Sequence, residues 1–369
     1  MLLKLSDLHI NDYTAIVNKL NRKKVVLGFD GFIDIIVKPI QSGHVGNNPD
    51  YFETLKSFGN YISSRHELSG SIELETIMEK IGGNVPNTAA AMKSLGARVV
   101  CIGALGYPER HPLFLETFEP EEMISVTDPG QCISFEFQDG KLMCALNKSI
   151  NDMDWNIIKS RVPLEKLMDL YSMSDMLVFV NWSELPHAGQ IWEGVYDEIF
   201  TKIPEGKWVL FDLSDCTRKS DEQIREGIKI IRKFAQKSRA ILSLNENEGK
   251  SVSQALFGKA LAGEAEGRRI LEYTGASVVV FHHLDKTFSF TPDETYCFNN
   301  YLIKKPCIST GGGDNFNAGF CCGLLSGLSV PQSTVLGSLC GSYYVENAKC
   351  ATFPGIYEYA GKLANGKML

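Results

Sequence analysis

Three consecutive glycines precede an acidic residue near the C-terminal end of this chain: Gly311, Gly312, Gly313 and Asp314. Residues 315–325 are predicted to form a helix, so the glycines place unobstructed backbone N–H groups at the positive end of a helix dipole. Such a helix start can bind an anion. A neighbouring aspartate can accept the proton of a hydroxyl that attacks phosphorus. The alternative is a tight turn in which Asp314 merely caps the helix.

A second glycine pair, Gly82 and Gly83, precedes two asparagines, Asn84 and Asn87. Glycines allow the backbone to approach a polar ligand closely, and asparagine side chains offer both hydrogen-bond donors and acceptors. The small residues at 88–91 allow the helix that follows to lie against a sheet. This segment is a second candidate binding site, with a helix C-cap and a tight turn as the alternative.

The apolar pattern predicts the elements that must position these residues. A buried strand is expected at 25–29, directly before Asp30 and Asp34. Further apolar runs of strand length lie at 99–102, 176–180, 208–211, 240–244 and 277–281. Strands that are apolar throughout are buried on both faces, as in a parallel sheet. Helical stretches such as 221–237 lie between them, so we predict a doubly wound α/β sheet with ligands at the carboxyl ends of its strands.

Two segments depart from the alternation of buried strands and helices. Residues 132–137 and 142–146 alternate in polarity around a turn at Asp139 and Gly140, which predicts a β-hairpin. Residues 50–65 are expected to form an amphipathic helix, because their apolar residues gather on one side.

The two glycine segments together resemble the two signatures of the PfkB/ribokinase family of carbohydrate kinases. The segment from Gly82 to Ala97 is similar to the family's GG-x-x-x-N-x-A…LGA signature, and the segment from Ile308 to Phe316 is similar to its D-T-x-G-A-G-D-x-F signature. They stand in the family's order. The resemblance extends from Val25 to about Gly355.

This resemblance implies a ribokinase-like three-layer α/β/α fold with a mostly parallel central sheet, formed by a single domain over residues 1–369. It also implies a small β lid over the substrate, formed by segments at about 35–50 and 125–150. The segment between the first strand and Gly82 is longer than the family usually carries, and the helix at 50–65 is expected to pack on or cover the lid. A partner surface is the alternative. Lid strands of the family often pair between subunits, so a homodimer through the lid is also expected.

By the same resemblance, Asp34 accepts hydrogen bonds from sugar hydroxyls. A carboxylate suits this role because it offers up to about four acceptor positions. Gly82, Gly83 and Asn87 are expected to complete the substrate site. Asp30 is the competing carboxylate, but the family's spacing favours Asp34.

The resemblance also assigns the catalytic roles. Asp314 is expected to be the general base. The amides of Gly311, Gly312 and Gly313 are expected to hold the transferring phosphoryl group, because charge grows on its outer oxygens during transfer.

Asn245 and Glu248 follow the strand predicted at 240–244 and match the family's N-x-x-E motif. Together with Thr310, they are expected to bind the assembly of ATP and Mg²⁺, with Glu248 acting on the metal through water. Magnesium keeps several of its waters, which suits an outer-shell carboxylate. An acidic loop at a strand end is the alternative.

Three segments depart from the family's pattern. Ile308 stands where the second signature opens with an acidic residue, residues 281–286 replace a Thr-x-Gly, and residues 106–111 replace a Gly-x-D-x-x-G. His282 and His283 could suggest a metal, but neighbouring residues at a strand end point to opposite faces. A structural or nucleotide-adjacent histidine is therefore expected.

Composition and charge narrow the class of protein. The 369 residues are 44% hydrophobic and 22% charged, as in ordinary globular proteins. The net charge of −7 argues against general binding to nucleic acid or to anionic membranes. No apolar stretch approaches the roughly 18 residues that span a bilayer, and the N-terminus does not read as a signal peptide. The ten cysteines form no paired Cys-x-x-Cys pattern, so a reducing cytoplasm is the expected compartment.

We therefore predict an ATP-dependent enzyme that uses Mg²⁺ and phosphorylates a hydroxyl of a sugar or sugar-like compound. A nucleoside kinase of the same family is the nearest alternative. A protein that binds a sugar or nucleotide without turnover is the alternative from another class, and the departures on the nucleotide side motivate it.

Overall fold

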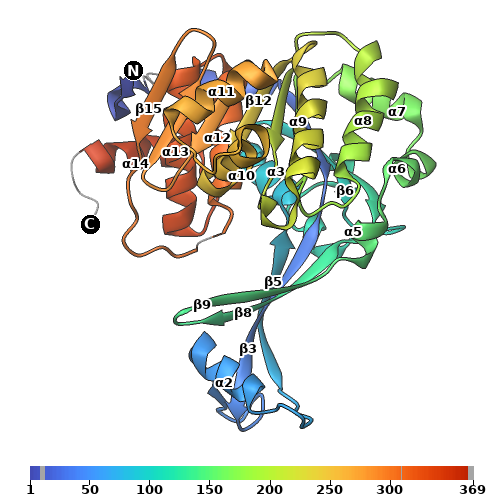
Figure 1. Ribbon diagram of the computed structural model, residues 1–369, viewed down its shortest axis with the longest axis vertical. Coiled ribbons are helices and arrows are strands. Elements are labelled where there is room, and N and C mark those ends of the chain that lie inside the picture. Colours follow the sequence, from blue (N-terminus) through green and yellow to red (C-terminus); the bar gives the residue numbers. More distant parts are fainter. Residues whose placement is uncertain (9–12, 309, 365–369) are drawn as a thin grey trace.

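The computed structural model describes residues 1–8, 13–308 and 310–364 (Figure 1). Within these ranges, ten strands form the main sheet. In spatial order they are β1 (Leu2–Leu3), β15 (Thr295–Asn299), β14 (Lys286–Phe290), β13 (Val278–His282), β12 (Arg239–Leu244), β11 (Trp208–Asp212), β10 (Met176–Phe179), β2 (Lys24–Phe29), β6 (Arg98–Ala104) and β7 (Met123–Thr127). Neighbours from β13 to β7 pair in parallel, whereas β14 is antiparallel to both of its neighbours. The predicted mostly parallel sheet is confirmed.

The strands of this sheet divide their side chains between two hydrophobic cores, one on each face. Val26 and Phe179 belong to one core, and the adjacent Leu27 and Val178 belong to the other. This alternation explains the continuous apolar runs, because both faces of each strand exclude water.

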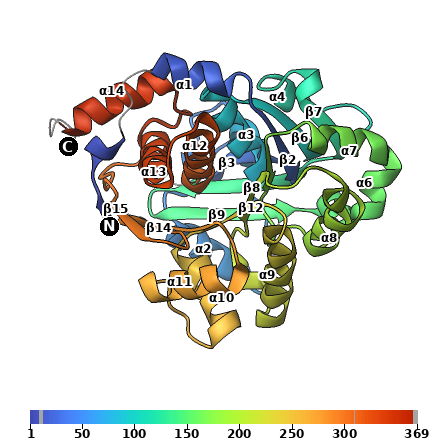
Figure 2. The ribbon, with the colours of Figure 1, turned by 90° about the horizontal axis from the view of Figure 1, so that it is seen from above.

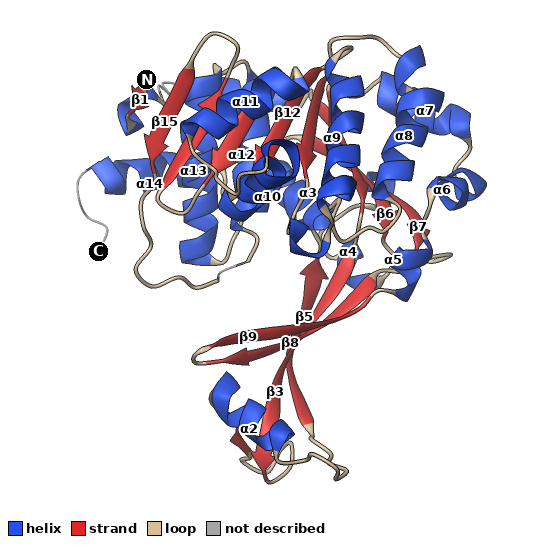
Figure 3. Ribbon diagram, in the orientation of Figure 1, coloured by secondary structure: helices blue, strands red, loops and turns tan. Residues whose placement is uncertain are grey.

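Two groups of helices cover the two faces and complete the three layers (Figures 2 and 3). The first core includes residues of α6 (Trp155–Arg161), α7 (Leu164–Ser172), α8 (Ala188–Glu198), α9 (Asp221–Ala235), α10 (Glu246–Phe257) and α11 (Glu264–Thr274). The second includes residues of α1 (Tyr13–Leu20), α3 (Asn84–Ser94), α4 (Pro112–Leu115), α12 (Gly312–Ser326), α13 (Val330–Asn347) and α14 (Phe353–Ala364). Among the described helices, none combines the length and hydrophobicity that crossing a bilayer requires.

Polar residues gather where the parallel strands end. Asp30 follows β2, Asn181 follows β10, Asp212 ends β11 and Asn245 follows β12. The strand order changes direction between β2 and β10, since β6 and β7 lie on one side and β11 to β13 on the other. In open α/β sheets, such a switch point at the carboxyl ends is where ligands bind.

A second sheet projects from this core, with α2 (Leu55–Ser63) near its far end (Figure 1). It contains β4 (Asp50–Tyr51), β3 (Phe32–Ser42), β8 (Gly130–Phe137), β9 (Gly140–Leu146) and β5 (Leu74–Gly82), and α5 (Lys148–Asp152) follows β9. We call this sheet with α2 the lid sheet. The predicted hairpin is β8–β9. The predicted lid segments did not include β5, which pairs along most of β3.

The helix predicted at 50–65 is shorter than expected. Asp50 and Tyr51 instead pair with β3 as a short strand, and Thr54 caps the helix by accepting a hydrogen bond of 3.0 Å from the Ser57 amide. Phe58 packs against Phe135 and Phe137 of β8, with ring centroids 5.5 Å apart in each pair. The helix therefore packs on the hairpin, as expected.

Candidate active site

The glycine run forms the start of α12. Gly311 is the N-cap residue, with a left-handed φ of 88°, and a Cβ there would lie 2.8 Å from the Tyr344 ring. Only glycine therefore fits at this position. The first N–H groups of a helix have no partner within the helix, so Gly312, Gly313 and Asp314 present amides at its positive end. Ser309, which belongs to the same signature, lies outside the described residues.

Asp314 is buried in the first turn of α12 and contacts α3. The Thr88 hydroxyl donates a hydrogen bond of 3.2 Å to its Oδ1. Burial raises the pKa of Asp314 well above its ordinary value, and the charges of Asp212 and Asp30 raise it further, while hydrogen bonds from Thr88 and Asn87 lower it. A carboxylate with a raised pKa is a stronger base, which suits the role predicted for Asp314.

Asp30 is fully buried at the start of α3. Its carboxylate accepts hydrogen bonds of 2.7 Å from the amides of Asn84 and Val85, and one of 2.6 Å from Nδ2 of Asn181. Burial raises its pKa to about 6, although these three bonds oppose the shift. Because its oxygens already accept these bonds, Asp30 has fewer acceptor positions left for a ligand, and the substrate role stays a prediction for Asp34.

Asp34 lies near the start of β3, beside the first glycine pair. A Cβ on Gly82 would lie 2.4 Å from Oδ1 of Asp34, and Asp34 is opposite Lys80 in the strand register. Burial raises the pKa of Asp34, whereas the charges of Lys80 and Lys141 lower it. Gly83 has a φ of 88°, and its position is crowded by Asp30.

The Tyr344 hydroxyl is near enough to both predicted aspartates, Asp34 and Asp314, to be affected by their charges. Burial, together with the charges of Cys350, Asp314 and Asp34, raises the pKa of Tyr344 to about 12. Both aspartates thus lie within electrostatic reach of one hydroxyl. Asn87, predicted to bind substrate, is near the start of α3, and its side chain contributes to lowering the pKa of Asp314. The structure therefore places the predicted substrate residues on the same side of the molecule as the predicted base.

Asn245 and Glu248 form a capping box at the start of α10. The Glu248 amide donates to Oδ1 of Asn245 at 3.0 Å, and the Glu248 carboxylate accepts from the Asn245 amide at 2.8 Å and from its Nδ2 at 2.6 Å. Burial and the charges of Asp212, Asp215 and Asp314 raise the pKa of Glu248 well above its ordinary value. The predicted nucleotide-side carboxylate therefore lies in the same electrostatic environment as the predicted base.

A buried hydrogen-bond network holds α12 in place, and it was not predicted. Nδ2 of Asn317 donates to Oδ2 of Asp212 at 2.6 Å, and Oδ1 of Asn317 accepts from the Ser243 hydroxyl at 2.6 Å. Asn317 lies one turn after Asp314, so these bonds attach the helix of the predicted base to the ends of β11 and β12. The feature of the sequence that could have indicated this network is Asp212, a lone carboxylate that ends an apolar strand.

His282 lies against the glycine helix start. Its ring stacks on Phe316 of α12, with centroids 4.9 Å apart, and a Cβ on Gly313 would lie 3.3 Å from its Cε1. Burial lowers its pKa to about 4, so the ring is neutral at pH 7. His283 instead contacts Phe288, with centroids 6.0 Å apart. The segment that departs from the family's Thr-x-Gly thus packs beside the predicted anion site.

Thr310 is exposed on the loop before α12, and a side chain from the lid sheet reaches it. Nζ of Lys141, on β9, lies 3.5 Å from Oγ1 of Thr310. In the described part of the chain, no group of three or more His, Cys, Asp or Glu side chains is arranged to hold a metal ion.

Comparisons with known proteins define the family. A sequence model of the family described as "Khk: Prokaryotic ketohexokinase" matches residues 11–361. The chain belongs to this family. The ketohexokinase of Haloferax volcanii is 23% identical over 349 residues, which cover 94% of this chain and 93% of that protein. The 5-dehydro-2-deoxygluconokinase of Clostridium perfringens is 21% identical over 277 residues, covering 73% and 80%.

Solved structures confirm the fold of this ketohexokinase family member. Ribokinase of Thermotoga maritima superposes with a TM-score of 0.64 at 18% identity, covering 92% of this chain and 99% of that one. Arabidopsis thaliana ribokinase, complexed with ribose and ATP, gives a TM-score of 0.61 at 15% identity, covering 92% and 98%. The predicted ribokinase-like fold and the predicted class, a carbohydrate kinase, are both confirmed.

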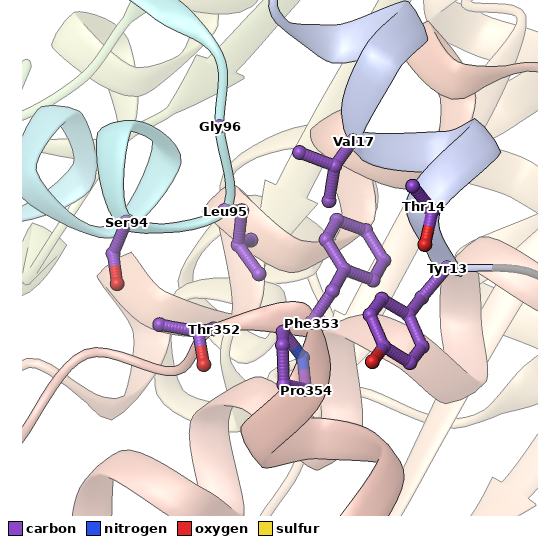
Figure 4. A pocket seen from close by; sticks show the side chains of 9 residues that line it. All are labelled: Tyr13, Thr14, Val17, Ser94, Leu95, Gly96, Thr352, Phe353 and Pro354. Carbon is purple, nitrogen blue, oxygen red and sulfur yellow. The ribbon is translucent and has the colours of Figure 1, made fainter.

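A separate pocket of about 250 Å³ lies at the opposite end of α3 (Figure 4). It is lined by Tyr13, Thr14, Val17, Ser94, Leu95, Gly96, Thr352, Phe353 and Pro354. These residues include none of the predicted site residues. The Ser94 hydroxyl already donates to the Ala351 carbonyl at 2.9 Å. The predicted site residues of this ketohexokinase family member therefore lie apart from this pocket.

Replacement of Asn317 by alanine tests the network that holds α12. Asn317→Ala leaves Asp212 and Ser243 without their buried partner, so we expect the free energy of unfolding to fall by about 2–4 kcal/mol. Urea denaturation measures this change. The control is Asn347→Ala, which removes an exposed hydrogen bond to the Tyr343 carbonyl and should change stability by less than about 0.5 kcal/mol. Equal effects of the two substitutions would contradict a structural role for the network.

Proposed function

We propose that this protein transfers the terminal phosphoryl group of ATP to a primary hydroxyl of a ketohexose. The observation that carries the proposal is the buried Asp314, placed beside the amides at the start of α12 and in contact with α3. The ketohexokinase of Haloferax volcanii supports the substrate class. The ribokinase complexed with ribose and ATP supports the phosphate donor.

In the proposed reaction, the attacking hydroxyl is held by the predicted substrate residues: Asp34, Gly82, Gly83 and Asn87. The hydroxyl oxygen forms a bond to the terminal phosphorus, the bond from that phosphorus to the bridging oxygen breaks, and ADP leaves. Asp314 accepts the hydroxyl proton. The amides of Gly311, Gly312 and Gly313 hold the outer oxygens of the transferring group, where charge accumulates.

The nucleotide side suits Mg²⁺ that is held mainly by phosphates and water. The charge of Asp212 raises the pKa of both Glu248 and Asp314, and Asp314 also raises the pKa of Glu248. A divalent cation nearby would offset this concentration of negative charge. Both oxygens of Glu248 accept hydrogen bonds from Asn245, so we propose that Glu248 acts on the cation through water. Thr310 is proposed to contact the phosphates of the nucleotide.

Removal of the proposed base tests the function most directly. We expect Asp314→Asn to lower kcat by about 10³-fold, because proton transfer contributes only in the transition state. The sugar KM should change by less than about threefold. An ADP-release assay over ketohexoses, other sugars and nucleosides measures this, with Asp293→Asn on the exposed β14–β15 turn as control. Equal activity of wild type and Asp314→Asn would exclude Asp314 as the base. If the wild type phosphorylated only nucleosides, the protein would be a nucleoside kinase and not a sugar kinase.

The raised pKa of Asp314 predicts the pH dependence. The base works as a carboxylate, so a pKa above the ordinary value of 3.8 moves the loss of activity on acidification to higher pH. We expect kcat/KM to fall as the pH decreases through this raised pKa. The residual activity of Asp314→Asn should lack this acidic limb. An acidic limb at or below pH 3.8 in the wild type would contradict the assignment.

We further propose a homodimer through the lid sheet. Apolar side chains of this sheet are accessible to water in one chain, including Ile77, Met78, Leu142, Met143 and Leu146. Pairing of two copies would cover such surface, and uncovered apolar patches mark association sites.

A cytoplasmic location, where ATP is available, is also proposed. It fits the absence of any disulfide among the ten cysteines, all of which lie in the described residues.

Sedimentation velocity tests the dimer. We expect the wild type to sediment with twice the mass of one chain, and Met143→Glu to shift it towards the monomer, because a charge is costly to bury in an apolar interface. Met173→Glu, at a methionine next to α7 that is more exposed than Met143, is the matched control and should leave the mass unchanged. A monomeric wild type at assay concentrations would refute the proposal.

A further inference from the structure

The lid hairpin brings one lysine to the loop that precedes the glycine helix start. Lys141 follows the hairpin turn directly, and its Nζ lies 3.5 Å from Oγ1 of Thr310. The charge of Lys141 also lowers the pKa of Asp34, against the effect of burial. One ammonium group therefore lies beside the proposed phosphate loop and within electrostatic reach of the proposed sugar carboxylate.

Among the described residues, no cationic side chain is one of the nearest neighbours of Cβ atoms built on the three glycines. The side chains nearest to Cβ atoms built on Gly311, Gly312 and Gly313 are those of Tyr344, Val345 and His282. His282 is neutral at pH 7, because burial lowers its pKa to about 4, and the Tyr344 pKa is raised to about 12. The described side chains nearest to the glycines thus add no positive charge to the amide dipoles. A transferring phosphoryl group needs positive charge as well as amide donors.

The long insertion before β5 holds the tip of the hairpin. The Leu55 amide donates to Oδ1 of Asp139 at 2.6 Å. The Gln138 amide and its Nε2 donate to the Glu53 carbonyl and carboxylate at 2.9 and 2.6 Å. A Cβ on Gly140 would lie 2.9 Å from Cδ1 of Leu55, so the packing at the turn is tight. These contacts fix the residues directly before Lys141.

From this placement, we propose that Lys141 is a catalytic residue whose ammonium group contacts the transferring phosphoryl group and stabilises its charge in the transition state. The insertion around α2 is then a support that positions Lys141. This proposal rests on the proposed phosphotransferase function. It adds a cation contributed by the lid sheet to the base and the amides contributed by the core.

Kinetics and nucleotide binding together test the proposal. We expect Lys141→Ala to lower kcat by about 10²-fold with little change in the sugar KM, and Lys141→Arg to retain most of the activity. By calorimetry with Mg²⁺ and sugar present, Lys141→Ala should bind the β,γ-imido analogue of ATP about tenfold more weakly than wild type. ADP should bind both proteins equally, because it lacks the group that Lys141 contacts. Lys56→Ala removes an exposed lysine of the same lid sheet and serves as control.

Two results would overturn the proposal: unchanged kcat and analogue affinity in Lys141→Ala, or an equal loss of affinity for ADP and the analogue. The binding measurement also separates this proposal from the proposed function. If the wild type phosphorylates no sugar in the screen, the proposed function fails. The difference between ADP and the analogue would still show whether Lys141 contacts the terminal phosphate.

Discussion

The fully buried carboxylate of Asp30 joins three parts of the chain at the point where the strand order reverses. Asp30 directly follows β2. Its carboxylate accepts hydrogen bonds from the first amides of α3 and from the side chain of Asn181, which follows β10. A buried carboxylate is tolerated only where hydrogen-bond donors surround it, so these three elements must meet there. The position of α3 follows from this constraint. Because α3 carries Asn87 and Thr88 to Asp314, the geometry around the predicted base depends on it.

Negative charge is concentrated at this edge of the sheet. Asp30, Asp212, Glu248 and Asp314 are all buried, and burial raises the pKa of each above its ordinary value; neighbouring negative charges raise the pKa values of Glu248 and Asp314 further. Two of them are stabilised by helix starts or capping bonds, and Asp212 by Asn317. Such an arrangement is unfavourable for the isolated protein, but it suits a site that receives a divalent cation and must accept a proton.

The core and the lid sheet make different contributions. The core holds the proposed base and amides on α12, which is attached to two strands through Asn317 and packed against α13. Sites built on packed helices and strands keep their geometry closely. The lid sheet carries Asp34 and Lys141, and its hairpin is supported by α2 through Phe58. The proposed sugar carboxylate and the proposed cation thus come from the lid sheet, whereas the proposed base and amides come from the core.

The sequence alone determined the alternation of buried strands and helices, the β8–β9 hairpin and the two glycine segments. These are local properties: apolar periodicity, turn residues and spacing along a few residues. The family's spacing favoured Asp34 over Asp30, but the sequence did not reveal the partners of Asp30, because these donors come from residues 54, 55 and 151 positions away. Nor did it predict the bond from Asn317 to Asp212, the pairing of β5 with β3, or the approach of Lys141 to Thr310. Each of these joins side chains or strands that only the tertiary fold brings together, so no pattern along the chain could have specified them.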